Sequence, residues 1–132
     1  MAYLIDTNVI IRLFTQDNKD MYQEAFTFFE RVANFEIEAI VSEGVVLESW
    51  FVLKNIYKMP KEEFVERFLS ILTLSNVIIQ DKQVLIEALK ILQRRNIDFI
   101  DALLCARAAV QGHKIYSFDT DIQKCLKEND AV

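Results

Sequence analysis

Two acidic residues follow short apolar runs at opposite ends of the sequence. Asp6 comes directly after residues 3–5, and Asp119 comes directly after residues 114–118. Runs rich in β-branched and aromatic residues predict buried strands, and parallel strands open onto a ligand crevice at their carboxyl ends. Both carboxylates are therefore predicted to face a site at one edge of a sheet. The alternative for Asp6 is that it, or Asn8, only caps the next helix.

Two further stretches carry acids in apolar surroundings. Glu48 stands on a predicted helix among apolar neighbours, where an unpaired charge is costly unless something neutralises it. Its alternative is a position at the polar edge of that helix, facing water. Asp98 and Asp101 open an Ala-rich helix, where the macrodipole favours acids. Two acids on one face, at i and i+3, nevertheless exceed what capping needs.

Converging carboxylates repel one another and attract a hard cation. At ~4 Å and an effective dielectric constant of ~20, each charged pair costs about 4 kcal/mol. Oxygen ligation without His or Cys favours Mg²⁺ or Mn²⁺ over Zn²⁺. A site of this kind suits hydrolysis of a phosphodiester, because the ion activates water and stabilises the leaving oxygen.

The composition predicts one globular domain. The chain has 132 residues, is 52% hydrophobic and carries a net charge of −5, which argues against a broadly basic nucleic-acid module. Neither a signal peptide nor a spanning segment is recognised, so we expect a cytoplasmic protein without membrane contact. Cys105 and Cys125 form no CxxC pair and are expected to be reduced, partly buried thiols. His113, the single histidine, is expected in a loop after the C-terminal cap Gly112.

Helices and strands are predicted to alternate along the chain. This pattern implies an α/β fold with a parallel sheet and right-handed crossovers. The predicted strands are residues 3–5, 36–41, 76–80 and 114–118, and helices are expected in the intervals between them and after Asp121.

Four motifs in this order resemble the PIN-domain ribonucleases of the VapC type, the toxins of prokaryotic toxin–antitoxin pairs. The motifs are Leu4-Ile5-Asp6-Thr7-Asn8, residues 42–53 with Glu48 inside, Asp98-Phe99-Ile100-Asp101-Ala102-Leu103, and Ser117-Phe118-Asp119-Thr120-Asp121. The resemblance implies a single PIN-like domain over residues 1–132. It also implies a three-layer α/β/α fold with a short central parallel sheet of four to five strands. Members commonly add a fifth strand after the last helix, and this chain is too short for a clear one.

The resemblance also implies the site and the activity. Asp6, Glu48, Asp101 and Asp119 match the family's metal-binding and catalytic acids, and Asn8, Asp98 and Asp121 match supporting positions, while the hydroxyl of Thr7 or Ser117 could orient a carboxylate or water. The expected activity is endoribonucleolytic cleavage of RNA with Mg²⁺ or Mn²⁺. An antitoxin protein is the expected partner, and an apolar groove that takes a partner helix would suit this architecture.

Basic and aromatic residues supply further candidates. Arg12, Lys54 and Arg107 lie on helices that carry or flank the acids, and are candidates for RNA binding. The alternative for each is a solvated helix face. Three aromatic residues of the predicted helix around Glu48 are expected to form either a homodimer interface or part of the core, namely Trp50, Phe51 and Tyr57.

Three other classes of protein compete with the nuclease interpretation. A receiver-like phosphoacceptor domain would use Asp81, but would need a Lys just past a late strand, which residues 117–119 do not offer. A haloacid-dehalogenase-type phosphatase needs Asp-x-Asp after the first strand, where Asn8 replaces the second acid. A non-catalytic PIN-like module binding RNA or protein would be expected to have lost one of the four acids.

Overall fold

The computed structural model describes residues 1–130, and the side chains of residues 1–128. Within it the chain forms two compact units, Met1–Gln80 and the part that begins at Asp81. The first unit contains β1 (Ala2–Leu4), α1 (Thr7–Thr15), α2 (Lys19–Ala33), β2 (Glu38–Ile40), α3 (Glu43–Asn55), α4 (Lys61–Leu72) and β3 (Val77–Ile78). The second contains α5 (Lys82–Arg94), α6 (Phe99–Gln111) and α7 (Thr120–Asp130).

The sheet of the first unit is parallel, with strand order β1-β2-β3. Leu4 lies beside Ile40, and Ile40 lies beside Ile78. Because the strands are parallel, β1 and β2 end at the same edge of the sheet. Asp6 follows β1 there, and Ser42, which follows β2, caps α3 by accepting a 3.2 Å hydrogen bond from the Val45 amide.

An aromatic cluster holds the helices of the first unit together. Phe14 of α1 meets Phe68 of α4 with ring centroids 5.3 Å apart, and Trp50 of α3 meets Phe64 of α4 at 5.0 Å. Edge-to-face pairs of this kind add about 0.5–1.5 kcal/mol beyond the area they bury. Trp50 is therefore core, whereas its neighbour Phe51 is 63% exposed.

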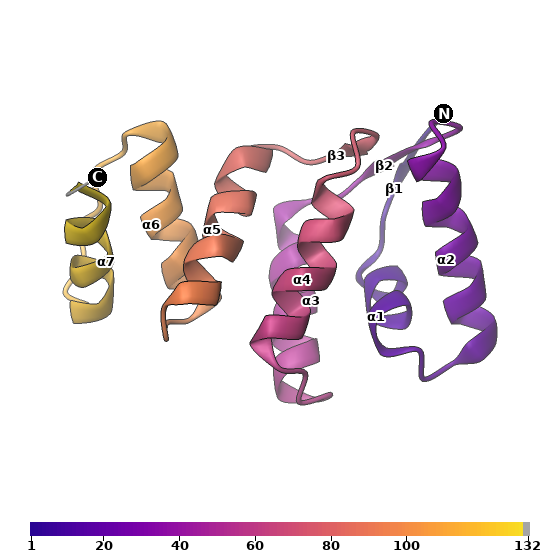
Figure 1. Cartoon of the computed structure of the whole chain (residues 1–132), viewed down its shortest axis with the longest axis horizontal. Helices are drawn as coiled ribbons and strands as arrows, with labels where there is room; N and C mark the ends of the chain where they lie inside the picture. The colour runs from indigo at the N-terminus through magenta and orange to yellow at the C-terminus, as the bar shows by residue number, and fades with distance from the viewer. Residues whose placement is uncertain (131–132) are drawn as a thin grey trace. The chain divides into compact units, whose positions relative to one another are not determined.

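In the second unit, α6 lies between α5 and α7 (Figure 1). The apolar face of α5 repeats at helical spacing, and its residues are buried, namely Val84, Leu85, Ala88, Leu89 and Leu92. This helix packs against α6, whose buried residues include two small ones that permit close approach, namely Ala102 and Ala106. Gly112 ends α6 in the left-handed conformation (φ 73°), as predicted.

The fold class is confirmed: helices alternate with the strands of a short parallel sheet, as in PIN-like proteins. The number of strands differs from the prediction. Among the described residues the sheet has three strands, and residues 114–118 form none. A strand exists only where a neighbouring strand supplies hydrogen-bond partners. In this structure that segment has none, and Tyr116 and Phe118 are about nine-tenths exposed.

The prediction of reduced cysteines is wrong for this structure. Cys105 of α6 and Cys125 of α7 form a disulfide, with Cα atoms 6.3 Å apart. The two residues are 20 positions apart in the sequence, and only the packing of α6 on α7 brings them together.

Among the helices of residues 1–130, none combines the length and the hydropathy needed to span a membrane.

Candidate active site

Asp101 and Asp119 are brought near each other in the second unit. Asp101 is half-buried in the first turn of α6, and Asp119 stands immediately before α7. Burial raises the pKa of Asp101, and the negative charges of Asp119, Asp98 and Asp121 raise it further. The electrostatics thus group three predicted acids around the carboxylate of Asp101. A cation bound among these acids would offset the repulsion between their negative charges.

Asp119 is held firmly by hydrogen bonds to the backbone. Its Oδ1 accepts from the amides of Asp121 (2.8 Å) and Ile122 (3.2 Å), so this carboxylate caps α7. Its own amide donates to the Oγ of Ser117 at 2.9 Å, so this hydroxyl orients the backbone of Asp119. Both cap bonds use one oxygen, which leaves Oδ2 as the atom that can turn to a ligand.

Asp6 and Glu48 belong to the first unit, and both are exposed. Asp6 occupies the N-cap position of α1, but its side chain makes no capping hydrogen bond. The capping alternative is therefore not realised at Asp6. Thr7 beside it is buried and Asn8 is exposed. Glu48 lies on the exposed side of α3, next to the fully buried Ser49. The Ser49 hydroxyl donates a hydrogen bond to the Val45 carbonyl at 2.7 Å.

The donor set suits a hard divalent cation. Within each unit, the described residues contain no group of three or more His, Cys, Asp or Glu side chains placed to hold a metal ion. The candidates are nevertheless all oxygen donors, and the negative charges of three other carboxylates act on Asp101. Oxygen ligands of this kind fit Mg²⁺ or Mn²⁺.

The three basic candidates for RNA binding all interact within the chain. Arg12 pairs with Asp17 at 2.9 Å, and Arg107 pairs with Asp81 at 3.1 Å. The ammonium group of Lys54 lies 5.3 Å from the centroid of the Trp50 ring. Because each basic side chain already contacts another residue of the chain, these contacts favour the solvated-face alternative over RNA binding.

Sequence reasoning missed the network around Asp17. Its carboxylate accepts from Thr15 (2.9 Å), Arg12 and, forty residues away, the Tyr57 hydroxyl (3.1 Å). The hydrogen bond from Thr15, followed by that from Arg12, lowers the pKa of Asp17. The same ion pair raises the pKa of Arg12. The motif that could have indicated it is Thr-x-Asp at the end of α1, but nothing local identifies Tyr57.

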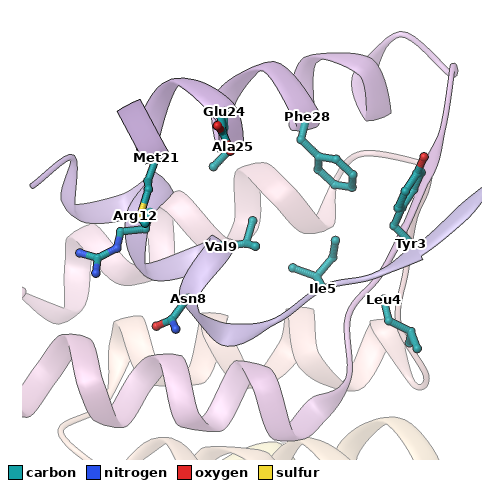
Figure 2. Close-up of a pocket in the computed structure, with 10 residues that line it drawn as sticks. All are labelled: Tyr3, Leu4, Ile5, Asn8, Val9, Arg12, Met21, Glu24, Ala25 and Phe28. Carbon is teal, nitrogen blue, oxygen red and sulfur yellow. The ribbon is translucent and has the colours of Figure 1, made fainter. Parts of the chain in front are cut away.

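A cavity of about 450 Å³ lies beside β1 in the first unit. Figure 2 shows Tyr3 of β1 and Ile5, which follows that strand, on one side of it, and Met21 and Phe28 of α2 across from them. Its wall is mainly apolar, and Asn8, Arg12 and Glu24 supply its polar groups. The Nε of Arg12 is buried and has no hydrogen-bond partner among the described residues. Such a surface favours apolar ligands with a few polar contacts.

Comparison with known proteins identifies the family of this chain. The sequence model of the PIN domain family matches residues 3–127, so the chain belongs to the PIN domain family. A VapC ribonuclease from Aquifex aeolicus (strain VF5) is 27% identical over 122 residues, which are 92% of this chain and 90% of that protein.

Proposed function

We propose that this protein is an endoribonuclease that depends on Mg²⁺ or Mn²⁺ and acts as the toxin of a toxin–antitoxin pair. The observation that carries the proposal is the grouping of Asp98, Asp101, Asp119 and Asp121 in a PIN-domain chain. The similarity to a VapC ribonuclease supports RNA as the substrate.

In this proposal Asp6, Glu48, Asp101 and Asp119 hold one or two ions, and Asn8, Asp98 and Asp121 support them. A bound Mg²⁺ or Mn²⁺ supplies positive charge that lowers the pKa of water and stabilises charge on the phosphate. The protein contributes fixed carboxylates. The two amides that grip Oδ1 of Asp119 keep that side chain in one orientation, which limits the reorganisation needed when a ligand arrives.

The test is incubation of the purified protein with end-labelled RNA in Mg²⁺ and in EDTA. Cleavage of the RNA in Mg²⁺ but not in EDTA supports the proposal. Parallel incubations with acetyl phosphate and with a chromogenic phosphomonoester examine the receiver-like and phosphatase alternatives. The receiver alternative is further weakened because Asp81, its acceptor, is paired with Arg107. RNA binding without cleavage would instead indicate a non-catalytic PIN-like module.

RNA binding by Arg12, Lys54 and Arg107 remains a proposal with its own test. Replacing all three by Gln should weaken binding of single-stranded RNA and reduce the slope of log K against log salt by about 2, if each contacts one phosphate. Filter binding between low and moderate salt measures the slope. The matched control is Lys19, Lys90 and Lys127 replaced by Gln, which removes the same charge from other helix positions. Equal slopes in the two triple variants would favour the solvated-face interpretation.

Partners of the toxin are also proposals. We place the antitoxin segment in the cavity beside β1, because its apolar wall suits an amphipathic partner. Ala25→Glu, a buried position on that wall, should prevent co-purification with a co-expressed antitoxin while Ala33→Glu does not.

A homodimer is supported by Phe51 and Ile56, both more than 60% exposed. Sedimentation of the pure chain at the mass of a monomer would contradict the dimer.

A further inference from the structure

The disulfide lies close to the acidic pair in the second unit. Cys105 is four residues after Asp101 on α6, so the two side chains share one face of the helix. Cys125 lies on α7, whose first residues are capped by Asp119. Both half-cystines are at most 1% exposed. The cross-link therefore joins the helix that carries Asp101 to the helix that Asp119 caps.

Besides the disulfide, the start of α7 is held by a hydrogen bond that the Gln123 side chain donates to the Ser117 carbonyl at 3.1 Å. Residues 112–119, which lead into it, form neither helix nor strand. At the opposite end of α7, Glu128 accepts hydrogen bonds from Arg95, with Oε2 2.7 Å from Nε and 2.6 Å from Nη2. This pair would keep the far end of α7 attached to the end of α5 if the disulfide opened. Apart from the disulfide, the buried side chain near the start of α7 is Ile122. The cross-link at Cys125 therefore ties α7 to α6 at a point between the Arg95–Glu128 pair and Asp119.

We propose that the Cys105–Cys125 disulfide is a redox-sensitive positioning element that keeps Asp119 beside Asp101. When it is oxidised, the start of α7 stays against α6 and the acids share one site. When it is reduced, α7 pivots about the Arg95–Glu128 pair and the acids separate. The inference rests on the proposed nuclease function, because its consequence is a change in metal binding and RNA cleavage.

The switch needs a thiol reductant, which we identify as a dithiol. A thiolate of the dithiol attacks one sulfur, forms a mixed disulfide and releases the other cysteine as a thiolate. The second thiol of the dithiol then attacks the mixed disulfide, closes the reductant's own disulfide and releases the remaining cysteine. Two electrons and two protons pass to the protein, which gains two thiols, while the dithiol becomes a disulfide. Because both half-cystines are buried, attack requires a transient local opening that exposes the disulfide to the reductant.

The experiment compares the oxidised protein, the protein reduced with dithiothreitol, and the Cys105→Ala/Cys125→Ala variant. Thiols are counted by alkylation and intact mass, and dithiothreitol is removed without oxygen before metal is added. Three quantities are then measured: hydrogen exchange of the Asp121 and Ile122 amides, Mn²⁺ binding by electron paramagnetic resonance, and RNA cleavage. Reduction should speed exchange, weaken Mn²⁺ binding and slow cleavage by about 100-fold, as expected for catalytic groups displaced by about 1 Å. The double variant should behave like the reduced protein in either condition.

Leu89→Ala is the matched control, because it removes a fully buried side chain from α5 and leaves the cross-link in place. It should lower the melting temperature yet keep Mn²⁺ binding and the response to dithiothreitol. Unchanged exchange at Asp121 and Ile122 after reduction would overturn the inference. Equal rates of RNA cleavage by the oxidised and reduced proteins would also overturn the inference, but would be consistent with the nuclease proposal. An oxidised protein that neither binds Mn²⁺ nor cleaves RNA would overturn both.

Discussion

Asp101→Asn should reduce Mg²⁺-dependent RNA cleavage by about 1000-fold or more while the protein remains folded. The substitution keeps the shape of the side chain but removes a charged metal ligand. Metal ions supply several kcal/mol of transition-state stabilisation, and each 1.36 kcal/mol is a factor of ten in rate. Asp6→Asn should have a similar effect, because Asp6 makes no capping bond that could explain its presence. Initial rates of cleavage with saturating Mg²⁺ measure both.

The control for this prediction is Asp20→Asn. Asp20 is also an acid in the first turn of a helix, α2, and therefore has the same local favourable interaction with the helix dipole. It is not one of the acids that raise the pKa of Asp101. Circular dichroism must show the same helix content for all variants. Wild-type activity in purified Asp101→Asn would remove this residue from the metal site, whatever Asp6→Asn does.

The second large effect concerns stability and needs no substrate. The pKa of Asp101 is raised in the folded protein, so between its ordinary value and the raised value the folded state binds more protons than the unfolded state. Stability from this group is present at lower pH and is lost as the pH rises through the folded pKa. At neutral pH the charged carboxylate is therefore destabilising, and Asp101→Asn should melt higher than wild type in EDTA.

Mn²⁺ should reverse that order. A ligand that binds only the folded state adds RT ln(1 + [L]/Kd), about 2.7 kcal/mol at 100 times Kd. For a chain of this size the gain in Tm is about 10 °C. Asp101→Asn should lose most of this gain. Thermal unfolding in EDTA and in Mn²⁺, at several pH values, measures both effects.

Asp119→Asn provides a contrast within the same site. Its carboxylate caps α7, and Asn can still accept the cap bonds, so Asp119→Asn should mainly reduce the gain from Mn²⁺. Asp119→Ala removes the cap as well and should also lower stability in EDTA by about 1 kcal/mol. A metal ligand without a capping role should show only the reduced gain from Mn²⁺. If wild type ignores Mn²⁺ and Asp101→Asn melts lower in EDTA, these acids are structural and the nuclease proposal loses its physical basis.

Local features of the sequence were sufficient to predict most of the helices. Asp98 before α6 and Gly112 after it mark helix ends, and the structure has each in that place. These signals act over one or two turns, because a cap bonds to amides or carbonyls only a few residues away. The order of acids, helices and strands that indicates the PIN family can likewise be read from the sequence, and the match to the family model confirms the family.

Contacts between distant residues were decided only by the tertiary structure. Nothing near Cys105 indicates that Cys125 would be its partner, and nothing near Asp17 indicates the hydroxyl of Tyr57. Trp50 and Phe51 are adjacent and chemically alike, yet the direction in which α3 faces makes one core and the other exposed. Residues 114–118 have the composition of a strand, but a strand needs a partner whose backbone the local sequence does not contain. The sequence thus determined which residues could form helices, strands and a site, and the path of the chain decided which of them meet, because a contact depends on both partners at once.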